Sequence, residues 1–262
     1  MGLSPCLKFV IGGTLTILSW DNPVTAFFRK SKKLRHSLGR PSRSDFVQFQ
    51  SCGEIESNRR FEVVEIMPMV SKLKYGNTNT FFIRGIEGNL LIDTDYAGTL
   101  PAFYRTLKEN NIKISDITYV LATHYHPDHM GIVSEIMKQG VRLLLIDTQC
   151  QYIHFADEIF NRDKRLSYEP INADNAIIIN CKESRDFMQN IGIKGEIIST
   201  TSHSKDSISL ILDNGICIVG DLEPIEYLEA YGKNISLEND WNCVMSHNPK
   251  IIYYSHVNEK VL

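Results

Sequence analysis

The most informative stretch of this chain is Thr123-His124-Tyr125-His126-Pro127-Asp128-His129. It follows an apolar run, Ile117–Ala122, that predicts a buried strand, and it precedes Met130–Lys138, whose apolar residues recur with helical period. Imidazole nitrogens and a carboxylate oxygen together are the ligand set of a borderline-soft divalent cation. Their concentration between a buried strand and a helix predicts a metal site at a strand end.

The spacing of these ligands indicates that they do not all bind one ion. His124 and His126 lie two positions apart on an extended chain, so they point to one side and can bind a single metal together. Asp128 and His129 follow the turn at Pro127 and point elsewhere. This arrangement favours a second metal.

The rest of the chain alternates short β-branched or aromatic runs with helical patterns. The expected strands are Phe61–Ile66, Asn79–Ile83, Asn89–Ile92, Ile117–Ala122, Val141–Ile146, Ala176–Ile179, Glu196–Ser199, Ser207–Leu212, Ile216–Val219 and Ile251–Tyr254. The expected helices are Leu100–Asn110, Met130–Lys138, Gln149–Lys164 and Ile225–Tyr231. Strand meanders alternating with helices predict an α+β protein in which two sheets pack together with helices outside.

Length and composition are those of a globular chain. It has 262 residues, of which 43% are hydrophobic and 23% charged, which excludes a mostly disordered chain and a disulfide-stapled miniprotein. Residues 1–60 carry ten lysines and arginines against four acids, a net charge of +6, and residues 61–262 therefore carry −9. We predict a basic N-terminal extension over 1–60 and one catalytic domain over 61–262.

The N-terminal extension allows three interpretations. Residues 9–20 are apolar and residues 29–43 are basic. Twelve apolar residues are too few to span a bilayer, and a secretory signal has its positive charge before the apolar stretch. A peripheral membrane contact, an element packed on the domain and a loosely ordered leader all remain open.

Charge and cysteine use limit the partners and the compartment. The acidic body argues against nucleic acid and other polyanionic partners, so we expect a small-molecule substrate. The six cysteines include no C-x-x-C pair, which favours a reducing compartment, the cytoplasm. The oligomeric state is not fixed by the sequence.

The H-x-H-x-D-H string at residues 124–129 resembles the signature of the metallo-β-lactamase fold superfamily, and the resemblance runs from about residue 61 to residue 262. Four further stretches occur in that family's order: Leu91-Ile92-Asp93-Thr94-Asp95, Thr201-Ser202-His203-Ser204, Gly220-Asp221 and Ser255-His256. The resemblance implies an αββα sandwich with the active site at one edge, where strand ends converge.

By resemblance, the chain holds two divalent metal ions, with Zn²⁺ preferred and Mn²⁺ or Fe²⁺ as alternatives. Site one would consist of His124, His126 and His203, and site two of Asp128, His129 and His256, with Asp221 shared and Asp93 supporting the ligands from behind. From the residues alone, other interpretations stay open for the distant ligands. His203 can cap a turn, Asp221 can begin a helix, and His247 is a rival to His256.

Departures from the family's patterns separate its subgroups. Antibiotic-cleaving members with a thiolate ligand carry Cys where this chain has Asp221, and the oxygen-reducing di-iron members carry Glu where it has His126. Nucleases of the family add a domain or a basic arm, whereas only 74 residues separate His129 from His203. The chain therefore resembles the glyoxalase-II-like and lactonase-like hydrolases rather than an antibiotic-cleaving β-lactamase.

The expected function is a dinuclear metal-dependent hydrolase in which a metal-bridging hydroxide attacks a small ester, thioester or lactone carbonyl. Asp128 would also be catalytic, by steering or accepting a proton. The alternatives are a phosphodiesterase with the same metal centre, and a mononuclear non-haem iron oxygenase or a metal-binding non-enzyme. Phe155 and neighbouring aromatic residues are candidate walls for an apolar substrate group, or packing residues of a helix.

Overall fold

The structure is a computed structural model, and it describes residues 7–11, 14–18, 70–230 and 233–262. The chain divides into two compact units, Met1–Glu62 and Val63–Leu262. In the first unit, β1 (Leu7–Ile11) and β2 (Thr14–Leu18) pair as an antiparallel hairpin. The expected strand Phe61–Ile66 and the basic run lie outside the described residues.

Among the residues described, none of the helices has the length and apolar character needed to cross a bilayer. The cytoplasmic location remains a prediction.

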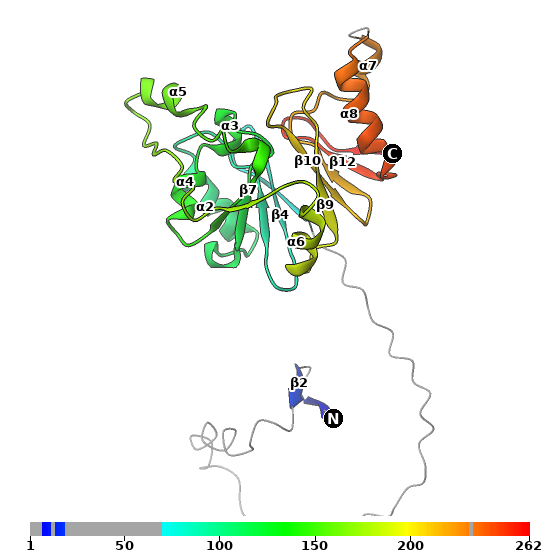
Figure 1. Ribbon diagram of the computed structural model, residues 1–262. Helices are drawn as coiled ribbons and strands as arrows, with labels where there is room; N and C mark the ends of the chain where they lie inside the picture. The colour runs from blue at the N-terminus through cyan, green and yellow to red at the C-terminus, as the bar shows by residue number, and fades with distance from the viewer. Residues whose placement is uncertain (1–6, 12–13, 19–69, 231–232) are drawn as a thin grey trace, which may run out of the picture. The chain divides into compact units, whose positions relative to one another are not determined.

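Two mixed sheets form the second unit. The first has the strand order β3-β4-β5-β6-β7-β8, antiparallel from β3 to β5 and parallel from β5 to β8. Its strands are β3 (Val70–Lys74), β4 (Asn79–Ile83), β5 (Leu90–Ile92), β6 (Tyr119–Leu121), β7 (Arg142–Ile146) and β8 (Ile177–Ile179). Figure 1 shows this sheet in cyan and green.

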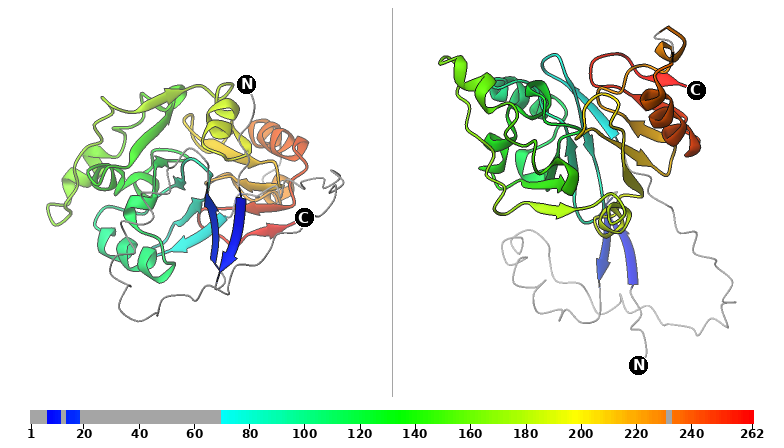
Figure 2. Two further views of the ribbon diagram at one scale, coloured as in Figure 1. Left: turned by 90° about the horizontal axis from the view of Figure 1, so that it is seen from below. Right: turned by 45° about the horizontal axis from the view of Figure 1, so that its top comes forward.

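The second sheet has the order β13-β12-β11-β10-β9. Its one parallel pair is β11 with β12, and its other neighbours are antiparallel. The strands are β9 (Gly195–Ser199), β10 (Ile208–Leu212), β11 (Ile216–Ile218), β12 (Ile251–Tyr253) and β13 (Lys260–Val261). In the right view of Figure 2, the yellow-to-red elements of this sheet lie on one side and the cyan-to-green elements of the first sheet on the other.

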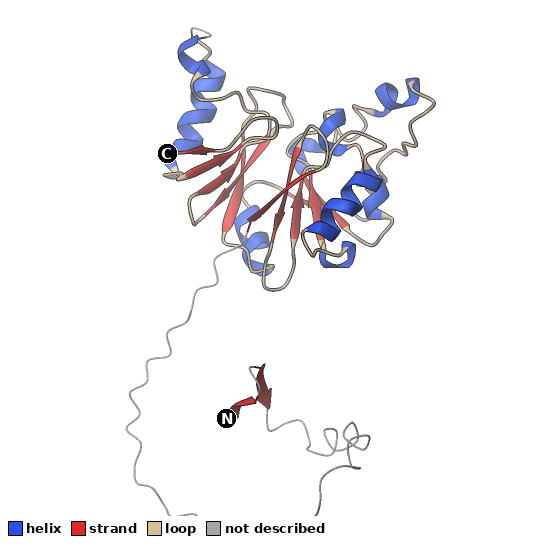
Figure 3. Ribbon diagram, turned by 180° about the vertical axis from the view of Figure 1, so that it is seen from behind, coloured by secondary structure: helices blue, strands red, loops and turns tan. Residues whose placement is uncertain are grey.

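The helices flank these sheets, as the blue ribbons of Figure 3 show. They are α2 (Leu100–Glu109), α3 (Pro127–Met130), α4 (Val133–Met137), α5 (Asp157–Arg162), α6 (Ser184–Asn190), α7 (Tyr227–Ala230) and α8 (Ile235–Ser246), with 3-10 turns at Ile114–Asp116 and Asp147–Gln149. The predicted α+β class with two mixed sheets flanked by helices is confirmed.

Burial explains why the central strands carry apolar residues on both faces. Phe81 and Ile83 of β4 pack against Leu210 of β10 in the core between the two sheets, whereas Phe82 belongs to the core under the helices. A strand covered on both faces loses the apolar–polar alternation of a half-exposed strand. All five residues of β4 and all five of β10 are accordingly buried.

The outer cores complete the four layers. Phe103 and Leu107 of α2 pack on the outer face of the first sheet. Leu237, Trp241 and Val244 of α8 pack on the outer face of the second. The predicted αββα arrangement is therefore observed.

Two predicted helices are wrong in extent. Met130–Lys138 is interrupted between α3, which ends at Met130, and α4, which begins at Val133, because the backbone of Ile132, with φ of −116° and ψ of 12°, leaves the helical conformation. Only α5 forms within the predicted helix Gln149–Lys164.

The residues before α5 form successive turns closed by hydrogen bonds between positions three apart. The buried side chain of Gln149 bonds to the Ala122 carbonyl, after β6, and to the Ile146 nitrogen, at the end of β7. In consequence Phe155 is 55% exposed instead of packed inside.

Candidate metal centre

The candidate ligands lie at strand ends that meet at one edge of the sandwich. The segment Thr123–His129 follows β6, and Asp221 and His256 follow the parallel pair β11 and β12. His203 lies in the loop between β9 and β10. Because the carboxyl ends of parallel strands point the same way, segments as far apart in the sequence as those of His124 and His256 converge here.

The three histidines expected in site one lie together. His124, His126 and His203 each offer a ring nitrogen within 4.8 Å of the others. Nδ1 of His126 and Nε2 of His203 are 3.2 Å apart. One of these two nitrogens can donate to the other, depending on the tautomer, and both can instead bind one shared cation.

The residues expected in site two form a second group. Asp128, His129 and His256 also offer ligand atoms within 4.8 Å of one another. Nε2 of His256 is 3.2 Å from Oδ2 of Asp128, and Nε2 of His129 is 3.9 Å from the same oxygen. His247 takes no part, since its Nε2 lies 3.4 Å from Glu196.

Asp221 lies between the two groups. Its Oδ2 is 3.3 Å from Nε2 of His129, 3.8 Å from Nε2 of His124 and 3.7 Å from Nε2 of His203. Its Oδ1 is 3.2 Å from Nε2 of His256. One carboxylate therefore touches both histidine sets.

Asp93 supports the cluster by hydrogen bonds to the segments that carry the candidate ligands. This fully buried residue has a left-handed backbone, with φ of +58°, at the end of β5. It accepts hydrogen bonds from the Thr123 nitrogen at 2.6 Å and the Thr123 hydroxyl at 2.9 Å, and from the Ser255 hydroxyl at 3.2 Å. Its Oδ2 also lies 2.9 Å from Nδ1 of His129. Occupying Nδ1 directs Nε2 towards a metal.

The imidazoles fit a metal by the way their two nitrogens are used. Nδ1 of His124 faces the Thr123 hydroxyl at 3.2 Å, and Nδ1 of His256 faces the Asn77 carbonyl at 3.4 Å. Nε2 of His124 and Nε2 of His129 are buried without a hydrogen-bond partner. Buried polar atoms are rarely left unpaired, so these two nitrogens indicate a missing electrophilic partner such as a metal ion.

The histidines and aspartates of the cluster shift one another's pKa values. Hydrogen bonds to Asp128 and Asp221 raise the pKa of His256 to about 10. Burial opposes charge on His129, but Asp93 and Asp221 outweigh it and raise its pKa to about 10. Burial likewise opposes ionisation of Asp221, but His129 and His256 hold the pKa of that carboxyl well below its ordinary value. The cluster is thus built to hold positive charge.

His124 behaves differently, because burial pushes its pKa well below the ordinary value. It stays neutral, which is the state in which imidazole binds a metal. Two tyrosines near the ligands are buried: Tyr125 lies in the core under the helices and Tyr254 in the core under α8.

Sequence reasoning missed several residues that shape the cluster. Thr123, Ser255, Asp206 and Gln149 bond to the ligand segments without being ligands themselves. Thr123 and Ser255 stand directly before His124 and His256, and this adjacency was the available signal. Asp206 and Gln149 had none, since their partners lie far away in the sequence.

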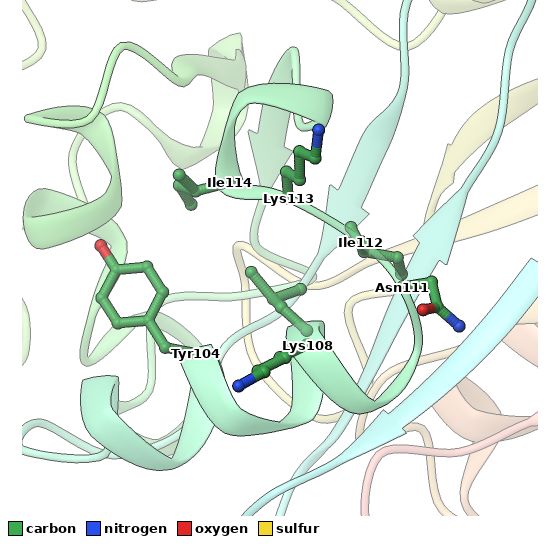
Figure 4. Close-up of a pocket in the computed structure, with 7 residues that line it drawn as sticks. Tyr104, Lys108, Asn111, Ile112, Lys113 and Ile114 are labelled. Atoms are coloured by element: carbon green, nitrogen blue, oxygen red, sulfur yellow. The ribbon is translucent and has the colours of Figure 1, made fainter.

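A separate surface pocket of about 450 Å³ lies at the end of α2. Figure 4 shows its lining from α2 and the turn that follows, and none of these residues belongs to the histidine and aspartate cluster: Tyr104, Leu107, Lys108, Asn111, Ile112, Lys113 and Ile114. The cluster, and not this pocket, carries the chemistry.

Gly220, directly before Asp221, lets the backbone pass close to Thr123 in the segment that carries His124. It has φ of +60°, and a Cβ there would lie 2.7 Å from the Thr123 hydroxyl, which Asp93 holds in place. Gly220→Ala should therefore be destabilised by backbone strain and by overpacking worth about 1–3 kcal/mol.

The matched control is Gly140→Ala, because Gly140 also has positive φ, +94°, but nothing lies within 4 Å of its added Cβ. Urea unfolding should show a larger loss for Gly220→Ala than for Gly140→Ala. Equal losses would contradict the close approach at Thr123.

Comparison with known proteins places the chain in a family. Residues 73–256 match the model of the metallo-beta-lactamase superfamily. A metallo-beta-lactamase family protein from Thermus thermophilus has a similar structure, with a TM-score of 0.55 and 18% identity over 74% of each chain. A beta-lactamase from Chitinophaga pinensis gives a TM-score of 0.52 at 17% identity, over 73% of this chain and 76% of that one. At these identities the matches show a shared fold.

A protein of Synechocystis sp. named as a diflavin flavoprotein A 2 is 27% identical over 92 residues, which are 35% of this chain. The match spans only 15% of that much longer relative, so it says little about the activity of this chain. The superfamily match, by contrast, covers well over half of the sequence and agrees with the fold and with the histidine and aspartate cluster. The chain is therefore a member of the metallo-beta-lactamase superfamily, most of whose members are hydrolases that use divalent metals.

Proposed function

We propose that this chain is a dinuclear metal-dependent hydrolase that cleaves a small ester, thioester or lactone, with Zn²⁺ as the preferred metal. The observation that carries the proposal is the position of Asp221, whose carboxylate lies 3.2–3.8 Å from histidines of both sets: His124 and His203 of site one, and His129 and His256 of site two. Nitrogen and carboxylate donors in this number suit two cations of the zinc type, with Mn²⁺ or Fe²⁺ as alternatives.

Two divalent cations, when bound, supply a water molecule acidified to a pKa of about 7 and a Lewis acid for the carbonyl oxygen. The residues supply position and charge. Asp93 fixes the orientation of His129, and the buried surroundings of His124 keep that ring neutral. Asp128, whose side chain is 36% exposed, lies 3.2 Å from Nε2 of His256 and can steer a proton as the leaving group departs.

Charge favours a carbonyl substrate over a phosphodiester. Residues 61–262 carry −9, which repels a polyanion. The cations next to α5 are already matched by acids: Arg165 bonds to Asp163 at 2.7 Å and Arg162 lies 3.8 Å from Glu158. These arginines offer little to an anionic group.

An apolar side of the cluster favours a substrate with an apolar group. The ring of Phe155 lies 5.5 Å from the ring of His126, and the side chain is largely exposed. An exposed phenylalanine beside a metal ligand is suited to contact an acyl chain or an aromatic ring. The glyoxalase-II-like and lactonase-like subgroups fit this substrate class.

His126→Ala should reduce hydrolysis of a panel of thioesters, esters and lactones by more than about 100-fold. Loss of a residue that only hydrogen-bonds to a metal ligand already costs about 10–100-fold in metal affinity or activity, and loss of the ligand itself should cost more. A chelator should do the same to the wild-type protein. His154→Ala is the control, since His154 is exposed and pairs with Asp157 away from the cluster of candidate ligands. Retained turnover in His126→Ala would contradict the proposal. Phosphodiester turnover alone, or one iron per chain with oxygen consumption, would favour the alternatives.

Phe155→Ala should lower kcat/KM for substrates with long acyl or aromatic groups by about 10-fold and leave acetyl substrates nearly unchanged, because the lost apolar contact is worth about 1–3 kcal/mol. The matched control is Ile178→Ala, which removes a side chain that is 54% exposed on the edge strand β8. Equal losses for all acyl groups would show that Phe155 does not contact the substrate.

A further inference from the structure

We propose that Asp206 is a positioning residue that holds the three histidines of site one as a set, so that its removal weakens site one and leaves site two. The inference rests on the proposed metal-dependent function. It concerns a residue that follows His203 by three positions and has no place among the seven ligands.

Asp206 joins the two segments that supply site one. Its side chain is buried, with 4% of the residue exposed. Oδ2 accepts a hydrogen bond from the Tyr125 nitrogen at 2.7 Å, and Oδ1 accepts one from the Ser204 hydroxyl at 2.7 Å. Tyr125 stands between His124 and His126, and Ser204 directly follows His203. One carboxylate thus ties together the backbone on which all three histidines are carried.

The backbone of Asp206 is held as well. Gln149 is fully buried, and its Nε2 donates to the Asp206 carbonyl at 3.1 Å and to the Ala122 carbonyl at 3.0 Å. Its Oε1 accepts from the Ile146 nitrogen at 3.2 Å. The Asp206 side chain is therefore attached to a backbone with little freedom to move, which makes it a rigid reference for both segments.

Site two is held by a different carboxylate. Asp93 pairs with His129 and accepts from Ser255, the residue before His256. Among the hydrogen bonds found in the described part of the chain, Asp206 has none to His129, Ser255 or His256. Asp93 also accepts from Thr123, directly before His124, so Asp93 supports both sites, whereas Asp206 bonds to Tyr125 and Ser204 beside the site-one histidines. Loss of Asp206 should therefore affect site one more than site two.

Within site one, positioning matters most for the histidines that are less buried than His124. His203 and His126 lie at the open side of the cluster, and the side chain of His203 is 27% exposed. Without Asp206 their loops gain conformational freedom, which must be given up when the metal binds. Hydrogen-bond partners behind a metal ligand typically contribute 10–100-fold to affinity.

The test is a Co²⁺ titration of the full chain against a competing chelator, followed by visible absorption and by elemental analysis. Asp206→Ala should bind one Co²⁺ with wild-type affinity and the other about 10–100-fold more weakly. Asp206→Asn should restore the weaker site, because its Oδ1 can accept from Tyr125 and its Nδ2 can donate to the Ser204 hydroxyl. Asp213→Ala is the matched control, since Asp213 is an exposed carboxylate in the β10–β11 turn that pairs with Arg185.

Each other outcome has a definite meaning. Two sites of wild-type affinity in Asp206→Ala, equal weakening of both sites, or an Asn variant as weak as Ala would overturn the inference. If Asp206→Ala does not fold, Ser204→Ala removes one of the two side-chain bonds alone and should weaken the same single site. Absence of Co²⁺ binding by the wild-type protein would overturn the proposed function itself.

Discussion

The buried carboxylate of Asp93 is the interaction on which the rest of the site depends. A charge without exposed surface is costly unless it is fully paired, so the chain must bring donors to it. The donors come from Thr123, His129 and Ser255, which belong to two ligand-bearing segments that lie far apart in the sequence. Satisfying this one carboxylate therefore fixes where the strands β6 and β12 end relative to each other.

The two-sheet core makes that convergence possible. Phe81 of the first sheet and Leu210 of the second belong to one core between the sheets, and this packing brings the ends of both sheets to one edge. The outer helices then hold the remaining loops. On α8, Asp240 accepts from the Ser202 nitrogen at 2.7 Å and Trp241 donates to the Glu223 carbonyl at 2.9 Å. These neighbours steady the segments that carry His203 and Asp221.

Most strands and the candidate ligands could be predicted from the sequence, because both signals are local. β4 begins and ends as predicted, and the ligands of the first motif lie within six residues. The helix α8 was missed, since Glu238 and Asp240 interrupt its apolar spacing, although Leu237, Trp241 and Val244 do lie on one face. Asp206 gave no signal, because its main-chain partner is 81 residues away. Contacts between residues so far apart in the sequence can be identified only from the folded structure.

The most direct test of the account is the metal content of the full chain, purified without added metal and measured by elemental analysis. The account predicts about two divalent cations per chain, removable by a chelator together with hydrolytic activity. Protein that contains no metal and takes up none when zinc, manganese or iron is supplied would contradict it.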